Sequence, residues 1–309
     1  MTAADARTAA VARSGVLMKR ATYASVAVVT TLLLAKTGAW LMTDSVSVLS
    51  SLLDSLLDAA ASLVNLFAVR TALIPADREH RFGHGKAEPL AGLVQAAFIA
   101  ASSVLLVLEA ARRLATPQPV KHGEVGVAVM LLSLVLTLAL VAYQRRVVRA
   151  TQSVAIDADS LHYQSDLLLN GSVIVSLALT TWLGWHALDP LFALGVAAYL
   201  LRTSWTIGRM ALDRLMDREL PDPDRARIRA IALAHPEVRA VHDLRTRSSG
   251  PDLFIQLHLE MDGAMSLLRS HEVADAAERE IMAIYPNAEV IIHQDPSGIE
   301  ETRRTFTAG

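Results

Sequence analysis

The sequence predicts an α-helical membrane protein with six transmembrane helices, followed by a small cytoplasmic α+β domain. The chain has 309 residues, of which 52% are hydrophobic, and its mean hydropathy is +0.36. Apolar windows of about 20 residues, the length that spans a bilayer, recur along the first two thirds of the chain. After residue 210 the composition becomes that of a soluble domain, with Pro221 and Pro223 at the transition.

The candidate spans differ in how polar they are. Four are clean runs of Ala, Leu, Val and Ile, whereas the second and the fifth contain carboxylates, Ser, Asn and His. The six windows are 21–42, 46–73, 88–111, 123–143, 158–182 and 188–208. We therefore expect a cytoplasmic N-terminal tail over 1–20, a transmembrane domain over 21–208 and a cytoplasmic domain over 209–309.

The basic residues predict the orientation in the membrane. Lys and Arg collect on one side, in the N-terminal tail and in the loops 75–86 and 144–153, while the short loops near 42–46 and 183–187 have none. The basic loop 112–122 is the exception. By the positive-inside rule, this distribution places both termini in the cytoplasm.

The last hundred residues read as a helix, two strands, a helix and a strand. Period-two alternation from Phe254 to Met261 is typical of a half-buried strand, with Gln256, His258 and Glu260 on its polar face. The other expected elements are helices over 224–235 and 267–285 and strands over 238–247 and 289–293. The order α-β-β-α-β predicts a small domain of the ferredoxin or metallochaperone type.

Composition also excludes several functions. The net charge is −2 and the pI is about 6.6, so no basic field marks a nucleic-acid partner. The sequence near Gly83 and Lys86 lacks the Ser/Thr and the first Gly of a phosphate-binding loop, so we expect no nucleotide. The chain has no cysteine, so any bound metal must take nitrogen and oxygen ligands.

Two pairs of polar residues stand out inside the apolar windows. Asp54 and Asp58 lie four residues apart in the second window, and His162 and Asp166 repeat that spacing in the fifth. Residues four apart share one face of a helix. Two facing helices that each present two ligands, one turn apart, can form a tetrahedral shell around a small cation.

The energetic cost of these residues argues for a bound ion. A carboxylate at a helix centre costs roughly 2.5–3.5 kcal/mol on insertion scales. No intramembrane Arg or Lys is placed to neutralise these carboxylates, and Lys36 in the first window is the only deep candidate. A dication, or protons in its absence, would remove the cost. A hydrogen-bonded polar seam between helices is the alternative. His162 favours Zn²⁺, Cd²⁺ or Fe²⁺ over Mg²⁺ and Ca²⁺, and metal binding would compete with protons.

Two further groups of candidate ligands lie outside the windows. In the loop 75–86, Asp77, His80 and His84 are three and four residues apart, although a polar loop of this kind is common without a metal. The soluble domain offers several His residues and one Asp on adjoining elements, which suggests one or two metal sites. These residues are His242, His258, His271, His293 and Asp295.

In combination, these motifs resemble the cation diffusion facilitator family, and most closely its bacterial zinc and ferrous-iron efflux branch. The motifs are VLSSLLDSLLD at 48–58, PADREHRFGHGKAE at 75–88, LHYQSD at 161–166, HDLRTR at 242–247 and VIIHQDP at 290–296. The resemblance extends from about residue 15 to residue 296, which is nearly the whole chain.

The resemblance implies a homodimeric metal–proton antiporter in the bacterial inner membrane, a secondary transporter and not an enzyme. It implies a transport site at Asp54, Asp58, His162 and Asp166, and a loop site at Asp77, His80 and His84. It also implies a binuclear cytoplasmic site at His242, His258, His293 and Asp295, with His271 beside it. Lys86 and Asp217 match the positions of an ion pair that joins the helix bundles in this family, and Asp44 is given no role.

Two other classes stay open from the residues alone. A membrane metalloenzyme would need an open coordination position and a general base, whereas all four membrane residues look committed to binding metal. A membrane-anchored metal sensor or buffer would bind metal in the soluble domain without transport.

Overall fold

The computed structural model describes residues 3–43, 46–115, 124–183 and 188–299. The chain divides into two compact units, one from Val11 to Met216 and the other containing the chain from Asp217 onward. Asp44, together with residues 300–309 of the expected cytoplasmic domain, lies outside the described residues.

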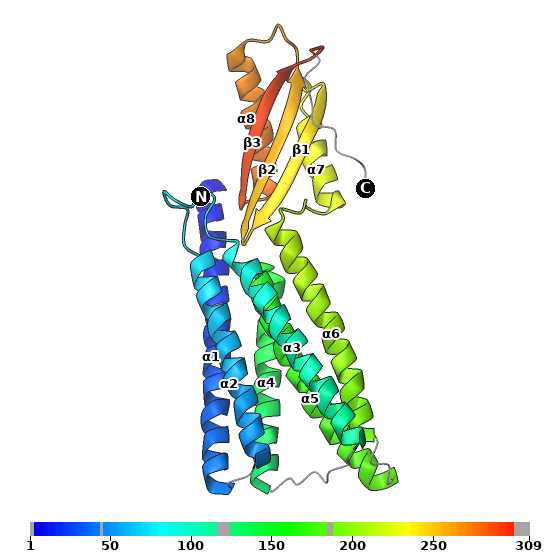
Figure 1. Ribbon diagram of the computed structural model, residues 1–309. Coiled ribbons are helices and arrows are strands. Elements are labelled where there is room, and N and C mark those ends of the chain that lie inside the picture. Colours follow the sequence, from blue (N-terminus) through cyan, green and yellow to red (C-terminus); the bar gives the residue numbers. More distant parts are fainter. Residues whose placement is uncertain (1–2, 44–45, 116–123, 184–187, 300–309) are drawn as a thin grey trace. The chain divides into compact units, whose positions relative to one another are not determined.

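The first unit consists of long helices (Figure 1), which confirms the predicted helical membrane domain. The helices are α1 (Ala3–Thr43), α2 (Val46–Ala72), α3 (Ala87–Ala115), α4 (Glu124–Thr151), α5 (Val154–Leu183) and α6 (Leu188–Leu215). Five of them are long and apolar enough to cross a membrane. The sixth, α5, carries the polar residues of the fifth window.

Large apolar side chains cover the outside of this unit. Met42 at the end of α1 is 80% exposed, and Trp205 in α6 is 73% exposed. In water such a surface would be an aggregation liability, whereas in a bilayer the same side chains contact lipid. The exposed surface therefore supports insertion of the whole unit.

Helix α5 packs at the centre of the first unit. Its residues Ala155 and Ile156 pack with Met18 of α1, Val69 of α2 and Val147 of α4. One turn further on, a second apolar cluster joins α5 to α3 and α6. It contains Ala96, Ile99, Ala158, Leu200 and Ile207. Because so many helices contact α5, its polar side chains face other helices more than lipid.

The second unit has the predicted α-β-β-α-β order. Its elements are α7 (Asp222–Leu233), β1 (Ala240–Ser249), β2 (Asp252–Met261), α8 (Leu267–Ile284) and β3 (Ala288–Pro296). The sheet has the order β1-β2-β3, with β1 antiparallel and β3 parallel to β2. This mixed three-stranded sheet confirms the expected α+β class.

The core of this unit lies between the sheet and its two helices. Ile255, Leu257 and Leu259 of β2 are each at most 1% exposed and pack with Ile228 of α7 and Ile281 of α8. The alternation predicted for this strand is therefore observed: the odd-numbered residues face the helices. The even-numbered residues, among them His258, lie on the opposite face.

Candidate metal centres

The first cluster lies between α2 and α5 in the membrane unit. Nε2 of His162 lies 3.0 Å from Oδ1 of Asp58, and ligand atoms of Asp58, His162 and Asp166 all lie within 4.8 Å of one another. We call these three residues the membrane cluster. His162 is only 8% exposed. A nitrogen and two carboxylate oxygens at these separations can bind one small cation.

Asp54 belongs to the same helix face but not to this cluster. It precedes Asp58 by one turn of α2, and its side chain is exposed. The structure thus brings together three of the four predicted transport ligands. One helical turn after Asp58, the hydroxyl group of Ser62 shares a hydrogen bond of 2.7 Å with the hydroxyl group of Tyr163, which also joins α2 to α5.

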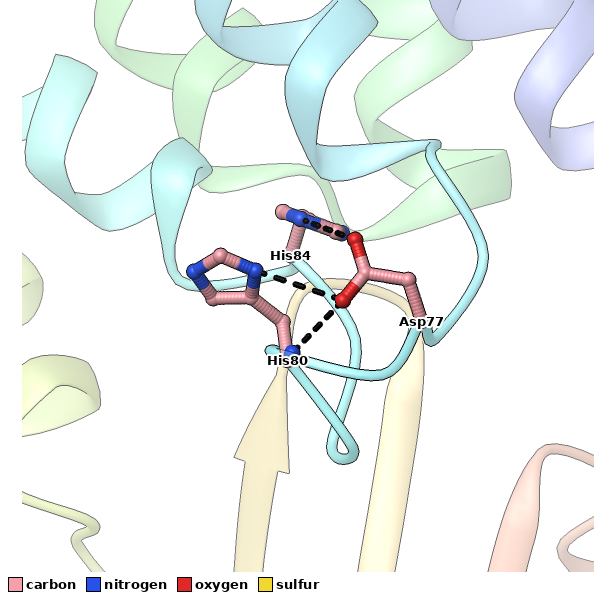
Figure 2. Close-up of side chains that lie close together, drawn as sticks. All are labelled: Asp77, His80 and His84. Atoms are coloured by element: carbon pink, nitrogen blue, oxygen red, sulfur yellow. Dashed lines mark hydrogen bonds and ion pairs between the residues drawn. The ribbon is translucent and has the colours of Figure 1, made fainter.

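The second cluster lies in the loop that joins α2 to α3. Figure 2 shows the Asp77 carboxylate facing both imidazole rings, with Oδ1 3.4 Å from Nδ1 of His80 and Oδ2 3.4 Å from Nε2 of His84. We call these three residues the loop cluster. The amides of His80 and Glu79 both donate to Oδ1, at 2.6 and 2.9 Å. Mainly because the His80 amide donates to it, the carboxyl group of Asp77 has a pKa below its usual range.

The third cluster is set by the register of the sheet. His242 of β1 pairs with His258 of β2, and His258 pairs with His293 of β3, so three imidazoles form a row across the sheet. The β1–β2 register shifts between His242 and Arg245, and Asp243 has a positive φ of 48°. A bulge of this kind lets His242 lie beside His258 while the rest of β1 keeps its own pairing.

Asp295 is the centre of this row. It is 4% exposed, and its Oδ2 lies 2.9 Å from Nδ1 of His258 and 3.2 Å from Nε2 of His242. Its Oδ1 lies 3.0 Å from Nε2 of His293. We call His242, His258 and Asp295, whose ligand atoms all lie within 4.8 Å, the sheet cluster. Among the described residues, Nδ1 of His242 has no hydrogen-bond partner, which leaves this nitrogen available to a metal.

Comparison with known proteins identifies the family. Residues 22–216 match the cation efflux transmembrane domain, and residues 220–297 match the cation efflux protein cytoplasmic domain, ZT_dimer. The cation-efflux pump FieF of Klebsiella pneumoniae subsp. pneumoniae is 51% identical over 285 residues, which are 92% of this chain and 95% of that protein. The cation-efflux pumps FieF of Citrobacter koseri and Salmonella choleraesuis are 50% and 49% identical over the same shares.

The chain belongs to the cation efflux family. The expected membership of the cation diffusion facilitator family is thereby confirmed. The protein is a multi-pass membrane transporter, a cation efflux pump, and not an enzyme. Its C-terminal domain is cytoplasmic and, as a ZT_dimer domain, dimeric.

Lys36 of this cation efflux protein is closer to the metal ligands than its sequence position suggested. Its ammonium group donates to the backbone oxygen of Ser51 at 3.1 Å and to Oγ of Ser55 at 2.6 Å, both in α2. It interacts electrostatically with the three carboxylates of the predicted transport site, Asp54, Asp58 and Asp166. Lys36 thus contributes to the charge balance of the site, a role that spacing within one helix could not reveal.

The membrane unit also contains a buried hydrogen-bond network around Asp159. The sequence alone did not distinguish this carboxylate from the metal ligands further along the same helix. Asp159 of α5 accepts hydrogen bonds from Ser25 Oγ of α1 at 2.7 Å and Gln144 Nε2 of α4 at 2.6 Å. Gln95 Nε2 of α3 donates to its other oxygen at 3.5 Å. We call these four residues the Asp159 network. From the sequence, a hydrogen-bonded polar seam between helices is the alternative to a metal site. Such a seam is present, one helical turn from His162, and it lies beside the membrane cluster.

Three predicted residues stand apart from the clusters. His271 of α8 is 62% exposed, and its Nδ1 lies 3.5 Å from Oδ1 of Asp275 on the same helix; it is not part of the sheet cluster. Lys86 donates to the backbone oxygen of Leu215 at 3.3 Å, and Asp217 lies 3.7 Å from Arg247. The Lys86–Asp217 pair stays a prediction.

Proposed function

We propose that this transporter exports Zn²⁺ from the bacterial cytoplasm across the inner membrane in exchange for protons, with Asp54, Asp58, His162 and Asp166 as the transport site. Fe²⁺ and Cd²⁺ are the other candidate cargoes. Both termini lie in the cytoplasm in this proposal. The observation that carries it is the membrane cluster, in which one imidazole and two carboxylates from two helices point toward one another.

The ligand types support a zinc-like cargo. Zn²⁺ takes three or four nitrogen and oxygen ligands in a tetrahedral arrangement, whereas Ca²⁺ and Mg²⁺ prefer six or more oxygens. The three residues of the membrane cluster would supply three ligands. Asp54, one turn away on α2, would supply the fourth after a change of side-chain rotamer.

The same ligands support exchange with protons. Carboxylates and imidazoles bind metal only in their deprotonated forms, so metal and protons compete for the same atoms. Imidazole changes protonation near neutral pH, which makes His162 suited to releasing a metal when a proton arrives. Each transport cycle would then return protons through the site that carried the metal out.

We assign accessory roles to the other two clusters. In the sheet cluster, a metal held by His242, His258 and Asp295, with His293 as a further ligand, would hold the cytoplasmic dimer together. The loop cluster is a more exposed and more weakly binding site. An ion pair between Lys86 and Asp217 would join the helix bundles of the dimer.

The test is Zn²⁺ flux in proteoliposomes with an imposed pH gradient. Asp54→Ala removes one of the four proposed ligands and should reduce flux to the level of protein-free vesicles. Asp157→Ala is the matched control, since Asp157 lies in the first turn of α5 and in none of the three clusters. Full transport by Asp54→Ala would contradict the four-residue site.

A further inference from the structure

The Asp159 network lies on the cytoplasmic side of the proposed transport site. Helix α6 leads into the cytoplasmic domain, so α5, the preceding span, runs the opposite way and begins at the cytoplasmic face. Asp159 precedes His162 by about one helical turn. A metal that comes from the cytoplasm must therefore pass the level of Asp159 before it reaches His162.

This part of α5 is closed in the structure. Ala155, Ile156, Ala158, Asp159 and Ser160 all have 0% exposure, and Ser153 before them has 3%. The membrane cluster is more open, because the side chain of Asp58 is 22% exposed. The structure thus represents a state in which the cytoplasmic side of α5 is sealed against its neighbours.

The seal combines apolar packing with the hydrogen bonds of the Asp159 network. Each donor comes from a different helix: Ser25 from α1, Gln95 from α3 and Gln144 from α4. Gln144 also donates to Ser25 Oγ at 2.8 Å, so the network is connected within itself. One carboxylate therefore links α5 to three other helices at the level that must open.

A buried polar contact of this kind suits a surface that must open and close. In the closed state the carboxylate depends on its three donors, because a buried charge without partners is very unfavourable. In an open state water can replace each of these hydrogen bonds. A purely apolar contact would gain nothing from water and would favour the closed state alone. Such a network suits an element that must be stable in two arrangements.

We propose that the Asp159 network is the cytoplasmic gate of the transporter, with Asp159 as the positioning residue that holds α5 closed against α1, α3 and α4. The proposal rests on the transport site proposed above, since it places the gate relative to His162. Its role is to keep the cytoplasmic path shut while the site releases metal on the other side.

Single-cysteine labelling tests the gate directly, because the chain has no native cysteine. Ser160→Cys places a thiol of similar size at a position with 0% exposure beside the network. A charged, membrane-impermeant thiol reagent is added to inside-out vesicles, and its rate of reaction measures access from the cytoplasmic side. No metal is required, so the test can succeed or fail independently of the flux of Asp54→Ala.

Asp159→Ala in this background should increase the labelling rate by at least about tenfold, because only the closed state loses the hydrogen bonds that join α5 to α1, α3 and α4. Asp157→Ala, two residues away and outside the network, should change the rate by less than about twofold. An unchanged rate in Asp159→Ala would overturn the proposal.

A double-mutant cycle separates gating from loss of structure. Asp159→Leu and Gln144→Leu should each raise the labelling rate, because each places an apolar side chain against a buried polar partner and removes the hydrogen bond between α4 and α5. Together they replace a polar pair by an apolar one and should restore a slow rate, so that their effects are strongly non-additive. Additive increases in the double variant would indicate general loosening of the bundle and would contradict the gate.

Discussion

The membrane cluster and the sheet cluster use similar ligands but are assembled in different ways. The His162–Asp58 contact joins residues 104 positions apart on two helices, and it depends on how those helices pack. The row of His242, His258 and His293 follows from strand register alone. A helical site can be opened by moving one helix, whereas a site built on hydrogen-bonded strands is rigid. This contrast fits a transport site in the first unit and a structural site in the second.

The largest effect on zinc-dependent stability is expected when the sheet cluster loses Asp295. Asp295→Ala removes the carboxylate that lies beside all three imidazoles of the row, and we expect zinc-dependent stabilisation of the cytoplasmic domain to disappear. A ligand present at a hundred times its Kd stabilises by about 2.7 kcal/mol, so the loss should be readily measured as a change in zinc-induced protection of β3 in hydrogen exchange.

His271→Ala is the control for that experiment. The His271 side chain is exposed and is paired with Asp275 on its own helix. Its removal should leave zinc-induced protection of β3 unchanged. Equal losses in His271→Ala and Asp295→Ala would mean that the sheet cluster extends to α8.

An intermediate effect is expected at the start of α5. Oε2 of Glu88, at the start of α3, accepts hydrogen bonds from Ser153 Oγ at 2.8 Å and from the amide of Val154 at 3.1 Å. Glu88 thus caps α5 from another helix, and Glu88→Ala leaves two buried donors unpaired. The expected cost is roughly 2 kcal/mol in total, measured as a lower melting temperature in detergent.

The exposed N-cap of α8 provides the comparison. Ser266 Oγ accepts a hydrogen bond from the amide of Arg269 at 3.2 Å, within its own helix. Ser266→Ala should cost about 1 kcal/mol, since water can reach the freed amide. Equal losses of stability in Glu88→Ala and Ser266→Ala would show that burial does not increase the cost of losing a helix cap.

The smallest effect concerns the loop cluster and its pH dependence. Because the backbone amides hold the pKa of Asp77 below its usual range, this carboxylate stays ionised as the pH falls from neutral. Its contribution to loop structure is present above its unfolded pKa and is lost only as the pH falls through the lowered folded pKa. The Asp77 carboxylate is therefore available as a metal ligand at mildly acidic pH, and its own titration should not set the pH at which metal leaves.

Asp77→Asn should therefore weaken zinc binding at the loop by roughly tenfold or more without moving the midpoint of its pH dependence. Zinc binding is measured by equilibrium dialysis. The zinc bound by the His80→Ala/His84→Ala double variant, which lacks the loop site, is subtracted to give the zinc bound at the loop. A midpoint that moves with Asp77→Asn would show that the carboxylate limits binding.

Features set within one helix or strand could be predicted from the sequence, whereas most contacts set by helix packing could not. Period-two alternation in 254–261 predicted which face of β2 is buried, and the apolar windows predicted the six long helices. The pairing of His162 with Asp58 could be anticipated because both are costly in a membrane. The pairing of Lys36 with α2 and of Asp159 with three other helices could not, because helical spacing gives the face of each side chain but not its neighbour across the interface.

Metal selectivity tests the central claim most directly, because His162 is the only nitrogen ligand in the proposed transport site. His162→Asp would convert the site to all-oxygen ligands, which favour harder ions. In proteoliposomes with Zn²⁺ and Mn²⁺ in competition, we predict that this variant shifts the ratio of initial fluxes toward Mn²⁺ by roughly tenfold or more, equivalent to a change of about 1.4 kcal/mol. An active variant with unchanged selectivity would show that His162 does not bind the metal in transit.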